Sequence, residues 1–198
     1  MIRLHHIEKQ YGTAKVLKGI NAEFEAGHVY GIVGKNGAGK TTLFNCIAGL
    51  TSYSGTIKSP YSPLRTHIAY LQTEPPFIDK LTAKEYLKLT LIGRALPFPN
   101  FEASNIFDLP LNKFVETYST GMKKKLALTG AILLKSDVYI LDEPFNGLDI
   151  ESSFNVTALL NHLKEQGKTV LVSSHIFSTL QESCDTIGIL EDGCITRW

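Results

Sequence analysis

One nine-residue run constrains the fold of this chain more than any other feature. Residues 34–42 read Gly-Lys-Asn-Gly-Ala-Gly-Lys-Thr-Thr, which matches the phosphate-binding pattern G-x-x-x-x-G-K-[ST]. The small residues let successive backbone N–H groups turn inward around an anion. The apolar run 29–33 before it is typical of a buried strand, and 43–48 after it is typical of a helix. A strand, this loop and a helix therefore form the first unit of the predicted fold.

The same run predicts a nucleoside triphosphate site. The Lys40 ammonium is expected to reach the β- and γ-phosphates, and the Thr41 hydroxyl to ligate Mg²⁺. The positive end of the following helix would face the same anion. A glycine-rich turn that matches by chance is the alternative, and the flanking strand and helix argue against it. The predicted phosphate-binding residues are Gly34, Lys35, Asn36, Gly37, Ala38, Gly39, Lys40, Thr41 and Thr42.

Composition narrows the class of protein. The chain has 198 residues, which is enough for one well-cored domain and few for two. Its net charge of +1 gives no electrostatic reason to expect nucleic acid as a direct partner. The three cysteines are widely spaced and suggest neither a disulfide framework nor a zinc site, which favours a reducing cytosol. The longest nearly uncharged apolar stretch, 126–134, is far shorter than the roughly 20 residues of a membrane helix.

Strand-like and helix-like segments alternate along the chain. Thr82 could cap a helix with Glu85 three residues later, and apolar residues at 86, 87, 89 and 91 would supply its buried side. Strand-like runs lie at 2–7, 20–24, 53–57, 68–71, 138–141 and 169–172, with a helical segment at 154–163 and a closing hairpin at 187–195. This order predicts a largely parallel α/β core with an antiparallel edge and one helical insertion.

Asp142 and Glu143 directly follow the apolar run 138–141. A carboxylate at the end of such a strand is placed to hold the Mg²⁺ shell, and Glu143 could polarise an attacking water. An Asp-Glu pair after a strand can instead cap the next helix. Because a phosphate loop lies upstream, the catalytic interpretation is favoured.

A third segment, 118–125, reads Tyr-Ser-Thr-Gly-Met-Lys-Lys-Lys and precedes a helical pattern. Three lysines at this position oppose the helix dipole, which favours acidic residues at a helix N-terminus. Two interpretations are open: either the lysines form a solvated basic face, or this end of the helix meets an anion. In the second case, the Ser119 side chain and the Gly121 N–H are the donors that a γ-phosphate would need.

Together these segments resemble the ATP-binding cassette (ABC) ATPases. The signature loop of that family is similar to Ser119, Thr120, Gly121 and Met122, which lie between the phosphate loop and Asp142-Glu143 in the family's order. The loop that crosses to the opposite subunit resembles Asn146, Gly147, Leu148 and Asp149. The Gly-Met-Lys ending of the signature is similar to the exporter-type, ABC-2-like bacterial branch.

Three single residues add to the resemblance. Tyr11 resembles the aromatic residue that stacks on adenine. Gln72 resembles the glutamine that senses Mg²⁺ and the transmembrane partner, and His175 the switch histidine that contacts the γ-phosphate. Taken singly, each is weak, because a lone Tyr, Gln or His is more often a packing or surface residue.

The resemblance implies the fold. It implies a P-loop NTPase of the RecA-like α/β type: a largely parallel sheet core with an N-terminal antiparallel β subdomain and a small helical signature subdomain. A single ABC ATPase domain would occupy residues 1–198. The β subdomain and phosphate-loop core would fill about 1–72, the helical insertion about 73–134, and the rest of the core about 135–198.

It also implies a mechanism. Two cassettes, identical or different, would meet head to tail around two ATP molecules, and each signature loop would complete the partner's site. Lys40, Glu143 and His175 would be catalytic. Mg²⁺ would be held by Thr41, Gln72 and Asp142, the last through a water. A separate transmembrane permease subunit would hold the cytoplasmic pair at the cytosolic face of the membrane, and ATP-driven closing and reopening would power transport, most simply export.

Departures and alternatives accompany this interpretation. Thr120 stands where the family usually has glycine, and a β-branched residue disfavours positive φ and crowds a phosphate. A GTPase would need a guanine-reading Asn-Lys-x-Asp, but 112–115 reads Asn-Lys-Phe-Val. A small-molecule kinase would leave the signature-like loop and His175 unexplained. A mechanical ABC ATPase acting on a soluble or nucleic-acid assembly, and a module that senses ATP without turnover, stay open.

Overall fold

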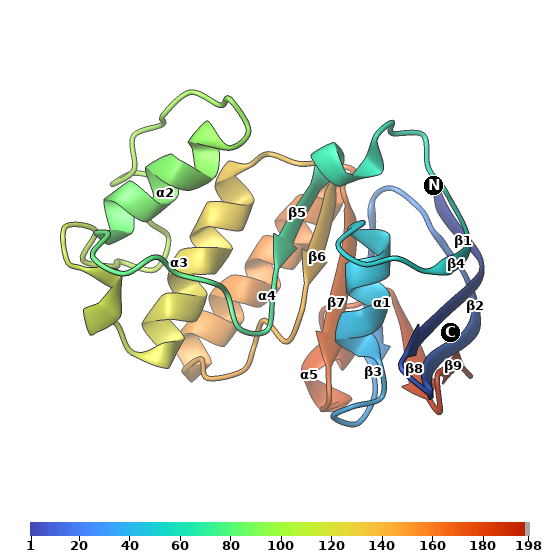
Figure 1. The fold of residues 1–198 in the computed structure, drawn as a ribbon. Coiled ribbons are helices and arrows are strands. Elements are labelled where there is room, and N and C mark those ends of the chain that lie inside the picture. Colours follow the sequence, from blue (N-terminus) through green and yellow to red (C-terminus); the bar gives the residue numbers. More distant parts are fainter. Residues whose placement is uncertain (197–198) are drawn as a thin grey trace.

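Two sheets organise the chain in the computed structural model, which describes residues 1–196 (Figure 1). The smaller sheet is antiparallel with the order β2-β1-β4. The larger has the order β5-β6-β7-β3-β8-β9, parallel up to β8 and closed by the antiparallel β9. The predicted fold class, a largely parallel α/β core with an N-terminal antiparallel sheet and a helical part, is confirmed.

The elements have the following bounds. The strands are β1 (Ile2–Tyr11), β2 (Ala14–Phe24), β3 (His28–Val33), β4 (Ser54–Lys58), β5 (Ile68–Leu71), β6 (Val138–Leu141), β7 (Thr169–Ser174), β8 (Thr186–Glu191) and β9 (Cys194–Ile195). The helices are α1 (Lys40–Ile47), α2 (Ala83–Ile92), α3 (Thr120–Leu133), α4 (Ile150–Glu165) and α5 (Ser178–Gln181), with 3₁₀ turns at Leu64–His67 and Val115–Thr117.

The first hairpin is longer than the apolar pattern predicts. β1 and β2 pair as far as Tyr11 and Ala14, whereas the alternation of apolar residues supports strands only over 2–7 and 20–24. In the extra pairs β2 still buries Leu17, but β1 contributes the polar residues 8–10, where the backbone ladder satisfies its own hydrogen bonds without an apolar alternation. Gly12, with φ of 56°, makes the turn between them.

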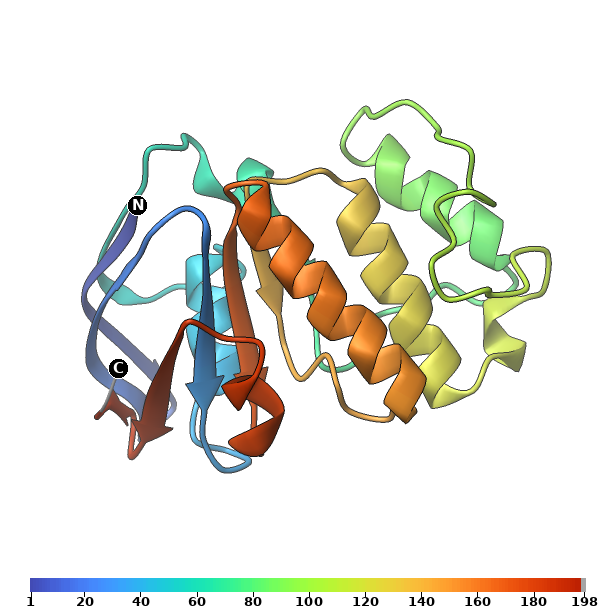
Figure 2. The same ribbon diagram turned by 180° about the vertical axis from the view of Figure 1, so that it is seen from behind.

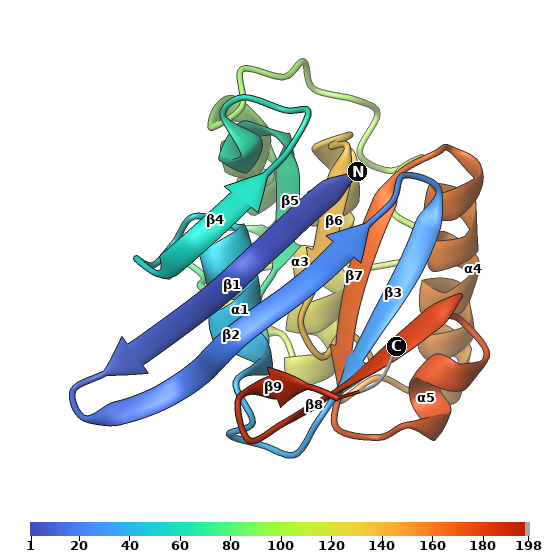
Figure 3. The same ribbon diagram turned by 90° about the vertical axis from the view of Figure 1, so that its right-hand side faces the viewer.

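Side chains on the two faces of the large sheet belong to two separate hydrophobic cores. In β6, Val138 and Ile140 pack with α1 and the small sheet, while Tyr139 and Leu141 pack with α3 and α4. A strand buried on both faces must be apolar throughout, as the sequence of β6 is. Helix α1 lies between the two sheets (Figure 3), and α3 and α4 cover the opposite face (Figure 2).

A third core holds the helical insertion. Thr82 caps α2: its hydroxyl accepts from the Glu85 amide at 3.3 Å, and the Glu85 carboxylate accepts from the Thr82 amide at 2.8 Å. The predicted capping box is therefore confirmed. Leu87 and Leu91 are buried one turn apart, but Leu89 is exposed, since it points about 200° around the helix from Leu87. The expectation that Leu89 belongs to the buried side is wrong.

Among residues 1–196, no helix combines the length and the apolar character that crossing a membrane requires.

Candidate nucleotide-binding and catalytic site

The phosphate loop connects β3 to α1 in a form that needs glycine. Gly39 is the N-cap of α1 with φ of 106°, a region that residues with a Cβ rarely adopt. At Gly34, an added Cβ would lie 2.5 Å from the Leu190 carbonyl oxygen, well inside contact distance. The loop borders a cavity of about 460 Å³, which residues from three other segments also line. The loop contributes Asn36, Gly37, Gly39, Lys40, Thr41 and Thr42, and the other segments contribute Tyr11, Val16, Thr73, Glu143 and Asn146.

Lys40 is buried at the entrance to α1. Its ammonium donates to the carbonyl oxygens of Gly34 at 2.7 Å and Lys35 at 3.3 Å. It also lies 3.2 Å from Glu143 Oε1, without hydrogen-bond geometry, so this buried carboxylate oxygen has no donor among the described residues. An ammonium that bonds to two carbonyls and forms a buried ion pair with a carboxylate, whose oxygen has no hydrogen bond among the described residues, fits a site for a phosphate and a water.

Three hydroxyls surround the fully buried Asp142 carboxylate. Asp142 Oδ2 accepts from Thr41 Oγ1 at 2.5 Å and from Thr73 Oγ1 at 2.8 Å. Asp142 Oδ1 accepts from the Ser173 hydroxyl. These bonds compensate for the loss of hydration of a buried carboxylate. Hydroxyl and carboxylate oxygens are also the ligands that Mg²⁺ prefers, so the donor set fits that ion.

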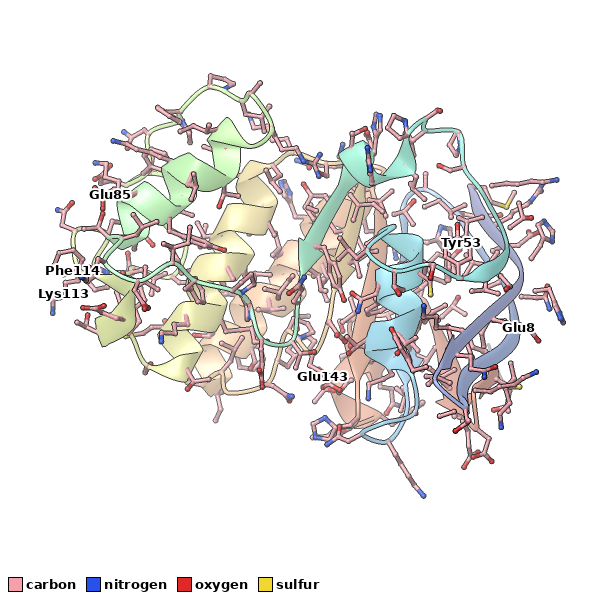
Figure 4. All side chains as sticks on the ribbon, in the orientation of Figure 1. Glu8, Tyr53, Glu85, Lys113, Phe114 and Glu143 are labelled. Atoms are coloured by element: carbon pink, nitrogen blue, oxygen red, sulfur yellow. The ribbon has the colours of Figure 1, made fainter. Side chains whose placement is uncertain are left out.

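Glu143 has a left-handed backbone, with φ of 51°. Such a conformation costs a non-glycine residue about 1–3 kcal/mol and persists where surrounding contacts fix it. Here the Glu143 amide donates to Ser173 Oγ at 2.9 Å, and Glu143 Oε2 lies 3.0 Å from His175 Nδ1. Figure 4 labels Glu143 at the lower end of the large sheet, beside the start of α1. The structure thus brings together the three predicted catalytic residues, Lys40, Glu143 and His175.

Tyr11 borders the same cavity from the small sheet. Its ring is about half exposed, and the Lys9 ammonium lies 4.8 Å from the ring centroid. An exposed ring beside the phosphate loop is accessible to a flat base. Tyr11 thus lies at the border of the phosphate cavity, and its stacking on adenine stays a prediction.

The signature-like loop lies away from this cavity, at the N-terminus of α3. Ser119 caps the helix by accepting from the Met122 amide at 3.2 Å. Thr120 is the first residue of α3 and has right-handed helical backbone, so the expected strain at positive φ does not arise. An added Cβ at Gly121 would lie 2.7 Å from the Gly147 carbonyl oxygen, which links this loop to the segment 146–149.

The lysines that follow do not form a solvated face. Lys124 is buried and donates to the Thr73 carbonyl oxygen at 2.6 Å. Lys125 pairs with Asp149 at 2.8 Å, and this contact holds the pKa of the Asp149 carboxyl well below its usual range. Asp149 also caps α4 by accepting from the Ser152 amide at 2.8 Å. Two of the three lysines therefore attach α3 to the segments that flank the phosphate site.

Comparison with known proteins decides the family. Residues 17–146 match the family model described as "ABC transporter". The chain belongs to the ABC transporter family. The cassette is 30% identical to the ABC transporter ATP-binding protein YtrB of Bacillus subtilis, over all of this chain and 71% of YtrB. It is 32% identical to the lantibiotic transport ATP-binding protein SrtF of Streptococcus pyogenes, over 98% of this chain and 89% of SrtF. It is also 32% identical to the bacitracin transport ATP-binding protein BcrA of Enterococcus faecalis, over 98% of this chain and 67% of BcrA.

Solved structures agree with this assignment. The cassette superposes on an ATP-binding subunit of an ABC transporter with a TM-score of 0.86 and 29% identity, over 98% of this chain and 88% of that one. A dimeric ATP-binding cassette in a post-hydrolysis state, bound to ADP and Pi, has the same fold with a TM-score of 0.88 and 23% identity, over 100% and 97% of the two chains.

The cassette differs from expectation in the loop that follows β5. Gln72 borders a separate hollow of about 180 Å³ between β5, α2 and α3, whereas Thr73 borders the phosphate cavity.

Sequence reasoning missed Thr73, Ser173 and Lys124. Lys124 stood in the lysine run, but Thr73 and Ser173 belong to no motif. Their only signal is a hydroxyl residue at or just beyond the carboxyl end of a parallel strand, where ligand-binding side chains collect.

Proposed function

We propose that this cassette is the ATP-hydrolysing subunit of an export-type transporter, powering a separate permease by closing and reopening a cassette dimer. One observation supports the chemistry above all: Lys40, Glu143 and His175 converge at the phosphate loop of a family member, where Glu143 Oε1 lies 3.2 Å from the Lys40 ammonium and has no hydrogen bond among residues 1–196. Relatives named for lantibiotic and bacitracin transport support the biological role.

ATP would bind with its phosphates inside the loop and its base against Tyr11. The Lys40 ammonium, which donates to the Gly34 and Lys35 carbonyls, would turn to the β- and γ-phosphates. Charge stabilisation of this kind is the main need of phosphoryl transfer. Mg²⁺, when bound among the oxygens of Thr41, Asp142 and the phosphates, would neutralise charge that develops on the nucleotide.

Hydrolysis would use the Glu143–His175 pair. Glu143 Oε1 accepts a hydrogen bond from a water and takes its proton as the water oxygen bonds to the γ-phosphorus. The bond from that phosphorus to the β–γ bridging oxygen breaks, and ADP and phosphate leave. His175, at 3.0 Å from Oε2, orients the carboxylate.

The placement of α3 supports a second cassette as a partner. Ser119, Gly121 and Met122 lie away from this chain's phosphate cavity, so they are available to a second cassette, and segment 146–149 lies against Gly121. We propose that residues 1–198 act as one domain in this dimer, at the cytosolic face of the membrane through the permease, without direct contact to nucleic acid.

The Glu143→Gln variant tests the proposal. It should bind Mg-ATP, form an ATP-dependent dimer, and hydrolyse ATP about 10²- to 10⁴-fold more slowly, since the proton acceptor is lost. Sedimentation velocity and a phosphate-release assay measure the two effects. Glu165→Gln, on the exposed end of α4, is the matched control and should behave as wild type. A Glu143→Gln variant that stays monomeric with saturating Mg-ATP and also hydrolyses normally would refute the mechanism.

A further inference from the structure

The loop after β5 presents a hydroxyl to the ion side of the phosphate site. Leu71 pairs with Leu141 in the β5–β6 ladder, and the Asp142 amide donates to the Leu71 carbonyl oxygen at 2.9 Å. This extra bond keeps the two chains together just past the strands. Thr73 Oγ1 consequently reaches Asp142 Oδ2 at 2.8 Å, while Gln72 borders the hollow on the α2–α3 side.

Two hydroxyls therefore converge on one carboxylate oxygen. Thr41 Oγ1 and Thr73 Oγ1 donate to the same Asp142 Oδ2, at 2.5 Å and 2.8 Å. Both threonines and Glu143 border the cavity that also holds Lys40. Neutral hydroxyls beside a carboxylate, facing a space for phosphate oxygens, form a set of hard oxygen ligands suited to a small divalent cation.

A buried ammonium fixes the backbone that carries this hydroxyl. Lys124 is only 4% exposed, and its Nζ donates to the Thr73 carbonyl oxygen at 2.6 Å. Burying an ammonium is costly unless nearby groups stabilise it. Burial lowers the pKa of the Lys124 ammonium, and the carboxylates of Asp142, Glu143 and Glu74 act in the opposite direction. The Lys124 side chain thus ties the loop to α3, the helix that begins at the signature-like residues.

We propose that Thr73, in place of Gln72, supplies a direct oxygen ligand to the divalent cation of bound ATP, and that Lys124 is the positioning residue that holds Thr73 there. The proposal rests on the proposed function, because the ion accompanies the nucleotide. In this arrangement the loop after β5 connects the ion to α3, because Thr73 would bind the ion and Lys124 of α3 holds Thr73.

Mn²⁺ is the probe for the test. Its binding to the full chain in the presence of ATP is measured as a decrease in the electron paramagnetic resonance signal of free Mn²⁺. The ATP affinity is measured in parallel in EDTA. Thr73→Val should weaken Mn²⁺ binding at least tenfold and leave the ATP affinity in EDTA unchanged, while Thr73→Ser should restore binding. Lys124→Met should weaken Mn²⁺ binding about tenfold, as expected of a residue behind a ligand.

Controls separate a ligand from a structural residue. Thr129→Val removes a buried hydroxyl from α3, where it donates to the Lys125 carbonyl oxygen, and should leave Mn²⁺ binding unchanged. A merely structural Thr73 would weaken ATP binding equally with and without the ion. If Thr73→Val binds Mn²⁺ normally, or if Gln72→Ala loses Mn²⁺ binding instead, the inference about Thr73 is overturned and the proposed function is not affected. Failure of the wild-type chain to bind ATP would overturn the proposed function.

Discussion

Ser173 is a residue that no motif predicts, and its replacement by alanine should disturb both carboxylates of the site. Its hydroxyl donates to Asp142 Oδ1 and accepts from the Glu143 amide at 2.9 Å, and the side chain is fully buried. Ser173→Ala therefore leaves the carboxylate without one of its donors and the amide without its acceptor, in a place that is closed to water.

The size of the effect follows from these two losses. A hydrogen bond to a charged group contributes about 1.5–3 kcal/mol, and an unsatisfied buried amide costs about 1–3 kcal/mol. Together they should lower the free energy of unfolding by about 3–5 kcal/mol, which corresponds to a fall in Tm of roughly 10 °C for a chain of this size. Since the amide bond helps to fix the left-handed turn at Glu143, kcat should also fall about 10²-fold.

Urea unfolding, followed by circular dichroism and fluorescence, measures the stability, and phosphate release measures kcat and KM. The matched control is Ser174→Ala, one residue further along β7. The Ser174 hydroxyl contacts Thr179 Oγ1 at 2.9 Å and the Ile176 amide at 3.0 Å. This control should cost only about 1 kcal/mol. Equal losses of stability in the two variants would refute the argument that Ser173 supports the buried carboxylate.

Further predictions concern three other positions. Tyr11→Ala should weaken ATP binding by about 1–3 kcal/mol through loss of stacking, whereas Tyr11→Phe should not, and isothermal titration calorimetry would detect either departure. Gly121→Ala should shift segment 146–149 away from the start of α3, because its Cβ would lie 2.7 Å from the Gly147 carbonyl oxygen, and this shift should reduce ATP-dependent dimerisation; unchanged sedimentation with Mg-ATP would contradict this. Burial raises the pKa of the Cys46 thiol to about 11, so at pH 9 the folded chain keeps Cys46 protonated. Iodoacetamide should therefore label the exposed Cys194 much faster than Cys46, and equal rates in the native state would contradict it.

The apolar patterns predicted most of the fold for simple reasons. A run such as 138–141 is typical of a strand with both faces covered, and Thr82 with Glu85 is typical of the start of a helix. The ends of elements were less predictable. The β1–β2 hairpin continues to Tyr11 through the polar residues 8–10 of β1, where backbone pairing holds the strand without an apolar alternation. Leu89 was misplaced because helical geometry, rather than hydrophobicity, decides which leucines of α2 are buried.

The sequence by itself determined the phosphate loop, the carboxylates after β6 and their order along the chain, because these depend on local residue types at fixed spacing. Only the tertiary structure decided which side chains meet. It placed Thr73 rather than Gln72 against Asp142, it put the Ser173 hydroxyl between the Asp142 carboxylate and the Glu143 amide, and it buried Lys124 against the loop after β5. These contacts join segments from four parts of the chain. Their geometry depends on strand register and helix packing, which no single segment encodes.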